Sequence, residues 1–311
     1  MENPSENFLY HKAGFFITQV VEQLPDGRRR VSHSRSHRKR LPPAEIGHDG
    51  IGVRALLVAN PWLHLWAPHR LAWWIAVLFI IGSSCFALAS FASNWPQYLS
   101  PEFGQGSVIN RVFFVGSLFF TAAAWLQLLE AINGDVADIG TATGTRHRSW
   151  RWFAWKPYNA GYSASLIQLV GTLLFNFNTA DAMISKLTLV EAELLVWTPD
   201  VIGSVCFLVA SYLALIEVSH RFWSFQPRQL SWWIVMLNLL GSAAFMLAAV
   251  FSFFLPSTGS AEWLWGANFF TLVGAVWFLV ASYLMIPELF GAARAVDTPF
   301  IAPLNAATKE T

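Results

Sequence analysis

Long apolar segments without charged side chains dominate this chain and are separated by polar connections. Five of them are uninterrupted, at residues 71–101, 112–129, 157–180, 229–261 and 263–287. A sixth, shorter segment covers 201–216, with Asp200 and Glu217 at its ends. A helix needs about 20 mostly apolar residues to cross a bilayer. We therefore expect an all-α integral membrane protein with six transmembrane helices, at about 71–93, 110–130, 160–180, 198–218, 230–254 and 266–287.

The six predicted helices form three pairs that repeat the same marker residues. The first helix of each pair follows an aromatic-x-Pro step, and fourteen residues after the proline it has a glycine: Gly82, Gly171 and Gly241. The second helix has its own glycine: Gly116, Gly203 and Gly274. A phenylalanine follows this glycine after four residues, and a glutamate follows after fourteen: Glu130, Glu217 and Glu288. Self-similarity at fixed spacings indicates a repeat architecture, so the chain predicts three helical-hairpin repeats in tandem.

The repeated glycines have a physical use in a bilayer. Lipid offers no hydrophobic force between helices, so small residues that allow close approach hold helices together. Fourteen residues of helix return to within about 40° of the starting direction, which places each second-helix glycine and its glutamate on one face. We expect all six glycines at helix–helix contacts and the glutamates on the same packing faces.

Composition agrees with this architecture. Apolar residues make up 55% of the 311 residues and charged residues only 13%, against about 25% charged residues in a soluble domain. We expect a basic N-terminal region and a C-terminal tail on either side of three membrane hairpins, with a loop after the first hairpin. The boundaries are 1–65, 66–130, 131–154, 155–218, 219–288 and 289–311.

Lysine and arginine are distributed unevenly among the connections. Ten lie in residues 1–70, and the connections after the second and fourth helices carry Arg146, Arg148, Arg151, Lys156, Arg221 and Arg228. The opposite connections carry Lys186, with Arg111 at the edge of a helix. Connections rich in Lys and Arg stay in the cytoplasm. We expect a multi-pass protein of the inner (plasma) membrane, with both termini in the cytoplasm and the three hairpins parallel to one another.

The N-terminal region predicts a small β-hairpin next to a basic segment. Residues 15–22 and 28–33 alternate apolar and polar side chains around the turn Pro25-Asp26-Gly27. The basic side chains are Arg28, Arg29, Arg30, Arg35, Arg38, Lys39 and Arg40. Such clusters bind anionic lipid headgroups, with about 1 kcal/mol per basic residue. We expect headgroup contacts here, and no nucleic acid because no aromatic platform accompanies the charge.

The three glutamates are the main candidates for a site, because carboxylates at membrane depth are functional hypotheses by default. Two interpretations remain open. Each glutamate could pair with a cation of the neighbouring cytoplasmic connections, which would also offset the helix dipole. Alternatively, the glutamates could form an ion, proton or ligand site with the intramembrane amides Gln168 and Asn238. The same amides could instead join helices by hydrogen bonds.

Known catalytic patterns are missing from the sequence, which has no Gly-rich phosphate loop, no His-Glu-x-x-His and no Cys-x-x-Cys. The sequence favours a non-enzymatic membrane scaffold, sensor or assembly module without cofactor or metal. A small-solute or ion transporter that uses the glutamates and amides is the alternative, and a membrane-bound enzyme at the cytoplasmic face is a third interpretation. Expected partners are the lipid bilayer, its anionic headgroups, and a second copy of the chain or another membrane protein.

The hairpins contain Gly-Ser…Phe steps such as Leu-Leu-Gly-Ser-Ala-Ala-Phe at 239–245 and Val-Gly-Ala-Val-Trp-Phe at 273–278. On these steps the chain resembles the YrhK-like domain family, which consists of short bacterial two-helix membrane modules. The resemblance covers 66–130, 155–217 and 230–288 and leaves out most of residues 1–65. It implies an integral membrane protein with no established activity and no catalytic residue to carry over.

Overall fold

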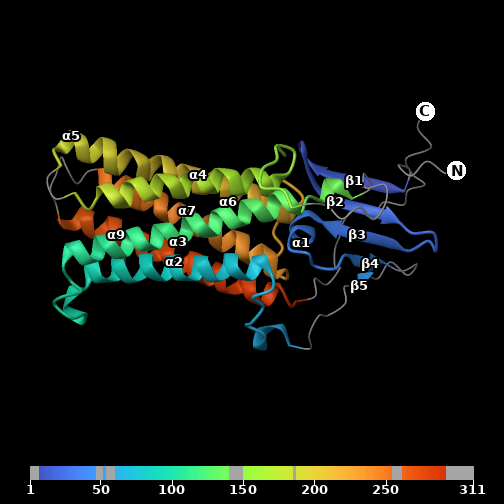
Figure 1. The fold of residues 1–311 in the computed structure, drawn as a ribbon, viewed down its shortest axis with the longest axis horizontal. Helices are drawn as coiled ribbons and strands as arrows, with labels where there is room; N and C mark the ends of the chain where they lie inside the picture. The colour runs from blue at the N-terminus through green and yellow to red at the C-terminus, as the bar shows by residue number, and fades with distance from the viewer. Residues whose placement is uncertain are drawn as a thin grey trace.

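The computed structural model describes residues 7–46, 52–53, 60–139, 150–184, 187–253 and 261–291. A bundle of six long helices makes up most of the molecule, and a small β-sheet from the N-terminal segment lies at one end of it (Figure 1). All six helices are long and apolar enough to cross a membrane. The prediction of a multi-pass membrane protein with six helices is therefore confirmed.

The observed helices lie close to the predicted ranges. They are α2 (Leu71–Asn94), α3 (Gly106–Asn133), α4 (Ala160–Asp181), α6 (Thr198–Ser219), α7 (Leu230–Phe253) and α9 (Ala261–Glu288). The largest difference is in the fourth span, where α5 (Leu189–Ala192) and the π-helical turn η4 (Glu193–Trp197) run into α6. Thr188 starts this extension with a capping box to Glu191. The prediction began later because it relied on charge-free sequence.

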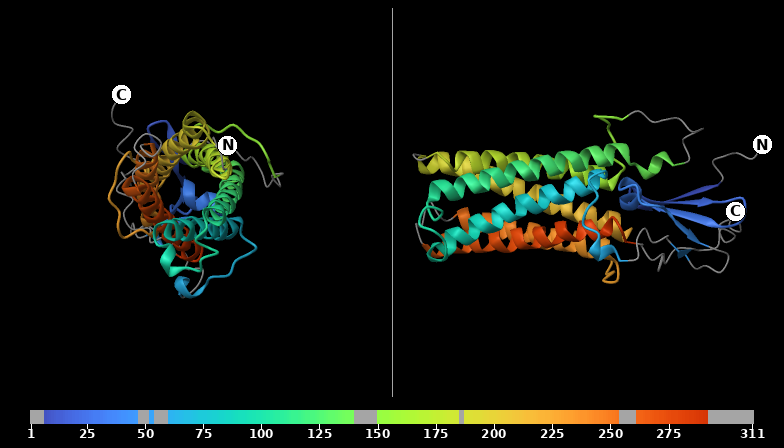
Figure 2. Two further views of the ribbon diagram at one scale, coloured as in Figure 1. Left: turned by 90° about the vertical axis from the view of Figure 1, so that its left-hand side faces the viewer. Right: turned by 60° about the horizontal axis from the view of Figure 1, so that its bottom comes forward.

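Viewed along its long axis, the bundle is a ring of helices (Figure 2). Each long helix packs against the preceding and following long helices of the chain, and α9 closes the ring on α2. The starts of α2, α4 and α7 and the ends of α3, α6 and α9 lie at the end that carries the sheet (Figure 1). This arrangement brings the last turns of three helices, which carry the three glutamates, to one end of the bundle.

The marker glycines of consecutive helices lie against each other. A Cβ on the first-helix glycine would stand 3.1 Å from the carbonyl oxygen of the second-helix glycine in each of the pairs Gly82–Gly116, Gly171–Gly203 and Gly241–Gly274. That distance is shorter than ordinary Cβ contacts. The missing side chains therefore set how closely the two helices approach.

Phenylalanine side chains fill the centre of the ring. Each helix contributes one, four residues after its marker glycine: Phe86, Phe120, Phe175, Phe207, Phe245 and Phe278. All six are buried, and their rings contact one another at centroid distances of 5.0 to 6.4 Å. Aromatic pairs contribute about 0.5–1.5 kcal/mol each beyond the area they bury. At this level the interior of the bundle is packed with side chains.

The outer surface of the bundle is apolar. Large exposed side chains on it include Leu118, Val170, Phe177, Val205, Leu247 and Val276. Aromatic side chains precede α2, α4 and α7 and are also exposed, at 75% for Trp66, 76% for Trp155 and 71% for Phe225. In a bilayer the aliphatic side chains would face the lipid tails and the aromatic ones the headgroups.

The N-terminal segment forms an antiparallel sheet in the order β1-β2-β3-β4-β5. The strands are β1 (Phe8–Ala13), β2 (Phe16–Gln23), β3 (Arg29–His33), β4 (Ala44–Ile46) and β5 (Gly52–Val53). The pair β2–β3 is the hairpin expected from the sequence, so that prediction is confirmed. The other strands were not predicted, because none of them alternates apolar and polar residues over a long enough range.

Candidate functional site

The short helix α1 (Ser34–Arg38) connects the sheet to the bundle. It follows β3 directly and lies against the ends of α3 and α6 (Figure 1). Two glycines make room for it. A Cβ on Gly134, after α3, would stand 2.6 Å from the Cα of Arg38, and a Cβ on Gly161, in the first turn of α4, would overlap the Arg38 guanidinium. The basic side chains of α1 and of Lys39 therefore reach into the end of the bundle.

Two cations and one hydroxyl bind Glu288 at the end of α9. Arg35 holds the carboxylate with one edge of its guanidinium, with Nε 2.8 Å from Oε1 and Nη2 3.0 Å from Oε2. The Ser231 hydroxyl at the start of α7 donates to Oε1 at 2.6 Å, and Lys39 Nζ donates to Oε2. Such bidentate, charge-assisted hydrogen bonds are stronger than neutral ones. They join α1 to α7 and α9.

Arg38 joins the other two glutamates. Its Nη1 donates to Glu217 Oε1 at 2.6 Å, and its Nε donates to Glu130 Oε2 at 3.3 Å. Ser34 donates a further hydrogen bond to Glu217 Oε1 at 2.7 Å. Glu217 Oε2 is buried and has no hydrogen-bond partner within the described part of the chain. One arginine thus connects the ends of α3 and α6.

These six charged side chains form a balanced cluster, which we call the ionic junction: Arg35, Arg38, Lys39, Glu130, Glu217 and Glu288. None of them is more than 11% exposed. Removing an ion from water costs several kcal/mol unless it finds a partner. The carboxylates also stand at helix C-termini, where negative charge opposes the helix dipole. The cations of the N-terminal segment offset both effects.

Burial changes the acidity of Lys39 in the ionic junction. It lowers the pKa of Lys39 below its ordinary value, and the positive charge of Arg35 adds to the effect. Lys39 is therefore the cation of the junction that alkaline pH reaches first, because an arginine keeps its proton throughout the accessible range.

The partners of the glutamates differ from those expected. One of the two open interpretations placed loop cations beside the glutamates, and we expected Arg35, Arg38 and Lys39 at lipid headgroups. The structure instead places these three cations inside the bundle end, and Lys156 pairs with Asp135 at 3.1 Å. The reason is that α1 returns the chain from the sheet to the bundle axis. A signal was available, since positions 35, 38 and 39 share one face of a helix.

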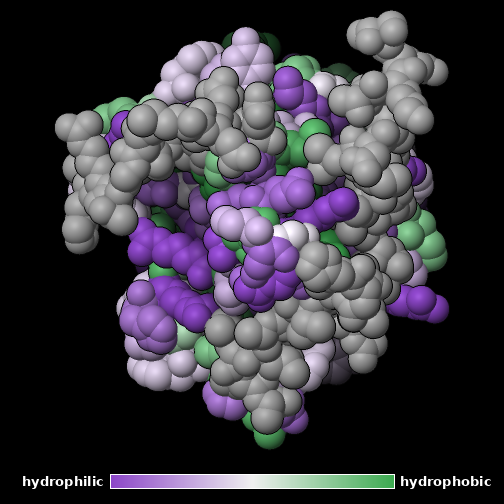
Figure 3. Space-filling view, turned by 90° about the vertical axis from the view of Figure 1, so that its right-hand side faces the viewer, coloured by the Kyte–Doolittle hydropathy of each residue, from purple (hydrophilic) through white to green (hydrophobic). Residues whose placement is uncertain are grey.

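The other basic residues of the segment lie outside the ionic junction. Arg28 and Arg30 form ion pairs with carboxylates of the sheet and its turn. Arg29 is half-buried on β3, and Arg40 is exposed after α1. Figure 3 looks onto this end of the molecule, where hydrophilic side chains gather. Contact of these four residues with headgroups stays a prediction.

Gln168 and Asn238 both hydrogen-bond to neighbouring helices, Gln168 through its side-chain amide and Asn238 through its backbone carbonyl. Gln168 on α4 accepts a hydrogen bond from Gln127 on α3 at 3.2 Å. The backbone carbonyl of Asn238 on α7 accepts from the Ser242 hydroxyl at 2.8 Å and from the Ser211 hydroxyl of α6 at 3.4 Å. The hydrogen bonds of the described residues bring the three glutamates together and do not include either amide in that cluster.

A histidine pair lies beside the ionic junction. His33 ends β3, and His220 follows α6 with a left-handed backbone, φ 56°. Their rings stack with centroids 4.9 Å apart, and His33 Nδ1 lies 2.9 Å from His220 Nε2. Burial, followed by the nearness of His33 and His11, lowers the pKa of His220 well below its ordinary range. A neutral His220 therefore joins the sheet to the end of α6.

The ion pairs of the ionic junction hold parts of the protein together. Its cations and carboxylates are engaged with one another, and among the described residues no three His, Cys, Asp or Glu side chains are grouped to hold a metal ion. Comparison of the chain with known protein families, with curated proteins and with solved structures finds no match. The geometry alone therefore carries the functional argument.

Proposed function

We propose that this protein is a non-enzymatic membrane scaffold, which holds a small β-sheet at the cytoplasmic surface of the inner membrane as a sensor or assembly module. The observation that carries the proposal is the ionic junction. Buried carboxylates from the ends of three helices bind one short segment of the same chain. A transport site would keep its carboxylates accessible to a solute.

The distribution of charge supports the proposed orientation, in which the end of the bundle with the sheet faces the cytoplasm. The connections that precede α4 and α7 carry Arg151, Lys156, Arg221 and Arg228, and they belong to the end of the bundle with the sheet. The positive-inside rule assigns that end to the cytoplasm. The three glycine contacts and three glutamates fit three tandem hairpin copies in one orientation.

Trypsin protection in inverted membrane vesicles tests this proposal. Cleavage after Arg38 and Lys39 should be slow in the native protein, because their side chains are buried. The double variant Glu217→Gln/Glu288→Gln should raise the rate at these sites roughly 100-fold, since breaking a buried ion pair costs about 3–5 kcal/mol and opens the segment locally. Mass spectrometry of the new termini gives the cleavage sites.

Glu45→Gln is the matched control for this experiment. It removes a carboxylate that pairs with Arg28 at 3.0 Å on the exposed sheet, where ion pairs contribute little. It should leave cleavage after Arg38 and Lys39 unchanged. Equal protection in the control and the double variant would contradict the proposal. Cleavage confined to right-side-out vesicles would contradict the orientation.

The hydrogen bond between Gln127 and Gln168 favours a second candidate, a small-solute or ion transporter, because amides inside the bundle could line a path. This candidate predicts that Glu217→Gln/Glu288→Gln abolishes solute uptake into vesicles while trypsin protection stays native. The scaffold proposal predicts that the double variant loses trypsin protection and that solute uptake does not depend on the two glutamates. A solute path through the bundle would also require the layer of six phenylalanine side chains to open.

A further inference from the structure

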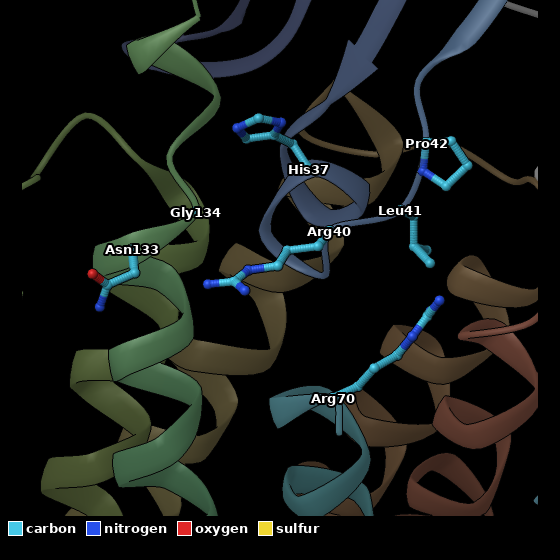
Figure 4. A pocket seen from close by; sticks show the side chains of 7 residues that line it. All are labelled: His37, Arg40, Leu41, Pro42, Arg70, Asn133 and Gly134. Carbon is cyan, nitrogen blue, oxygen red and sulfur yellow. The ribbon is translucent and has the colours of Figure 1, made fainter. Parts of the chain in front are cut away.

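The sheet meets the end of the bundle in two different ways. On the side of α2 and α3, a hollow of about 520 Å³ lies between the segment that follows α1, the start of α2 and the end of α3 (Figure 4). The guanidinium groups of Arg40 and Arg70 point to opposite sides of this hollow, and Arg70 Nη1 donates to the carbonyl oxygen of Leu289 at 2.8 Å. On the side of α4 and α6, by contrast, the turn between β1 and β2 packs directly against the bundle.

The turn between β1 and β2 has two residues, Gly14 and Phe15, and the residues on either side of it, Ala13 and Phe16, are paired. Gly14 has a φ of 61°, which glycine adopts without strain at the first position of such a turn. Phe16 is buried against the start of α4 and the end of α6. Phe15, at the tip of the hairpin, is 61% exposed.

Two further exposed rings lie beside this turn. The rings of Phe15 and Tyr158 meet edge to face with centroids 6.5 Å apart. A Cβ on Gly14 would stand 3.2 Å from Cζ of Phe222, so the Phe222 ring lies against the turn. Tyr158 is 65% exposed and Phe222 is 59% exposed. We call Phe15, Tyr158 and Phe222 the tip patch. Large apolar side chains that gather on a surface indicate a site of contact with a partner.

The tip patch lies at the level of the bundle where aromatic side chains meet lipid headgroups. Tyr158 lies just before α4, and Phe222 lies just after α6. The exposed Trp155 and Phe225 belong to the same two connections. The tip patch therefore continues the aromatic belt of the bundle, and Phe15 adds to it a residue that belongs to the sheet.

Two cations flank the tip patch. Lys12 lies on β1 just before the turn, and Arg221 directly precedes Phe222. Both side chains are exposed, and neither forms an ion pair within the described parts of the chain. Aromatic rings accompanied by exposed cations are typical of segments that lie in the interface of a bilayer with anionic lipids.

We propose that the tip patch inserts into the headgroup layer of the bilayer, so that the sheet is attached to lipid as well as to the bundle. Its rings bury apolar area at the boundary between headgroups and acyl chains, while Lys12 and Arg221 bind anionic headgroups. The tip patch meets whichever leaflet lies at this end of the bundle. The proposal therefore depends neither on the orientation of the protein nor on its role as a scaffold.

Quenching of a fluorescent label by lipids tests this proposal. The full chain carries Cys85→Ala and Cys206→Ala, and a nitrobenzoxadiazole label is attached to a single cysteine introduced by Phe15→Cys, Phe222→Cys or Leu9→Cys. Leu9 is the matched control, because it is 52% exposed but lies about 14 Å before the end of β1, on a strand that runs toward the bundle (Figure 1). The vesicles contain phosphatidylcholine and phosphatidylglycerol, with a nitroxide near the headgroup of part of the lipid.

We expect the labels at positions 15 and 222 to be quenched roughly threefold more than the label at position 9, because only the tip patch reaches the lipid. The two reporters are independent, and an unchanged midpoint of thermal unfolding identifies the labelled proteins that are folded. Equal quenching at all three positions, or no quenching at positions 15 and 222, would overturn the proposal. Blue-shifted emission without quenching would identify a protein neighbour and overturn it as well.

The contribution of the cations is measured with the label at position 15. Vesicles of phosphatidylcholine alone should quench this label less than vesicles with phosphatidylglycerol. Lys12→Gln/Arg221→Gln should remove the difference between the two lipids. Arg228→Gln, which changes an exposed arginine just before α7, should keep it. Equal effects of the double variant and of Arg228→Gln would contradict the binding of anionic headgroups by Lys12 and Arg221.

Discussion

Among single residues, Arg38 connects two helices through one side chain. Its guanidinium donates to Glu217 and to Glu130 from different edges of the same plane. A lysine could not do this with the same geometry, because its ammonium is a single point charge on a flexible stem. The space for the guanidinium exists only because residue 161 of α4 is a glycine.

Gly161→Ala should therefore weaken the ionic junction, although alanine is the better helix former by about 1 kcal/mol. The added methyl group would overlap the Arg38 guanidinium and stand 2.6 Å from Glu217 Oε1. Breaking a buried pair costs about 3–5 kcal/mol, so we expect a net loss of roughly 2–4 kcal/mol in the free energy of unfolding. Denaturant titration in detergent measures it.

Gly106→Ala is the control for this substitution. Gly106 begins α3, and a Cβ there meets nothing within 4 Å. This variant should keep or slightly raise the free energy of unfolding. If the two alanine variants behaved alike, Arg38 would not hold the bundle end in the way that its contacts indicate.

At the scale of elements, the sheet packs against the second helix pair, α4 and α6, and against the turn η3 (Val136–Asp138) that follows α3. The Ile17 N–H of β2 donates to the carbonyl oxygen of Tyr158 at 3.2 Å, just before α4. Phe16 packs with Ala160 and Ile216 in one buried cluster. Sheets of few, short strands are marginal on their own in water. These contacts and the histidine pair add to the attachment of the sheet to the bundle that the ionic junction provides.

The histidine pair predicts that acid loosens this contact. Folding lowers the pKa of His220 below the ordinary 6.5, so below about that pH the unfolded chain binds a proton that the folded chain does not. The stabilisation is complete above pH 6.5 and decreases as the pH falls toward the lowered pKa of the folded state. His33 and His11 oppose protonation of His220, while the Glu217 beside it is bound to Arg38.

We expect the midpoint of thermal unfolding to fall between pH 7.5 and pH 5.5, as scanning fluorimetry would measure. His220→Gln should flatten this dependence on pH. His64→Gln, which changes an exposed histidine in the turn before α2, should keep the native profile. Indistinguishable profiles for the native protein and His220→Gln would rule out the histidine pair as the cause.

The whole molecule is a closed ring with a packed centre, an apolar exterior and charge concentrated at one end. No hydrophobic force draws its helices together in lipid. Aromatic packing and the glycine contacts beside it supply the cohesion near the middle of the helices, and the ionic junction supplies it at one end. The phenylalanine layer lies midway along the helices, and the ionic junction lies where they end.

Phe175→Ala should show the contribution of the central layer. Phe175 is 7% exposed and contacts Phe86, Phe207 and Phe245, so its loss should lower the free energy of unfolding by roughly 3–5 kcal/mol. Phe177→Ala, on the same helix but 62% exposed, should cost less than about 1 kcal/mol, because lipid replaces its contacts. Titration with denaturing detergent compares them. Equal losses would mean that the centre is not packed.

Six membrane spans and the β2–β3 hairpin could be predicted from the amino-acid sequence, because both depend on patterns of apolar and polar residues within a short stretch of chain. Bilayer thickness converts directly into a length of apolar sequence. The alternation of side chains along a strand and the Pro-Asp-Gly turn are equally local. The positions of Gly161 and Gly134, by contrast, carry no such signal in the sequence, since the need for a glycine there arises only from the path of Arg38 in the fold.

The partners of the glutamates emerged only from the folded chain. Arg38 is 92 residues from Glu130 in sequence and Arg35 is 253 residues from Glu288, and no periodic pattern links positions so far apart. Their meeting depends on the sheet turning α1 back onto the bundle axis and on the ring closing between α9 and α2. Charge counting could show that buried carboxylates need cations. Which cations reach them depends on the three-dimensional path of the chain.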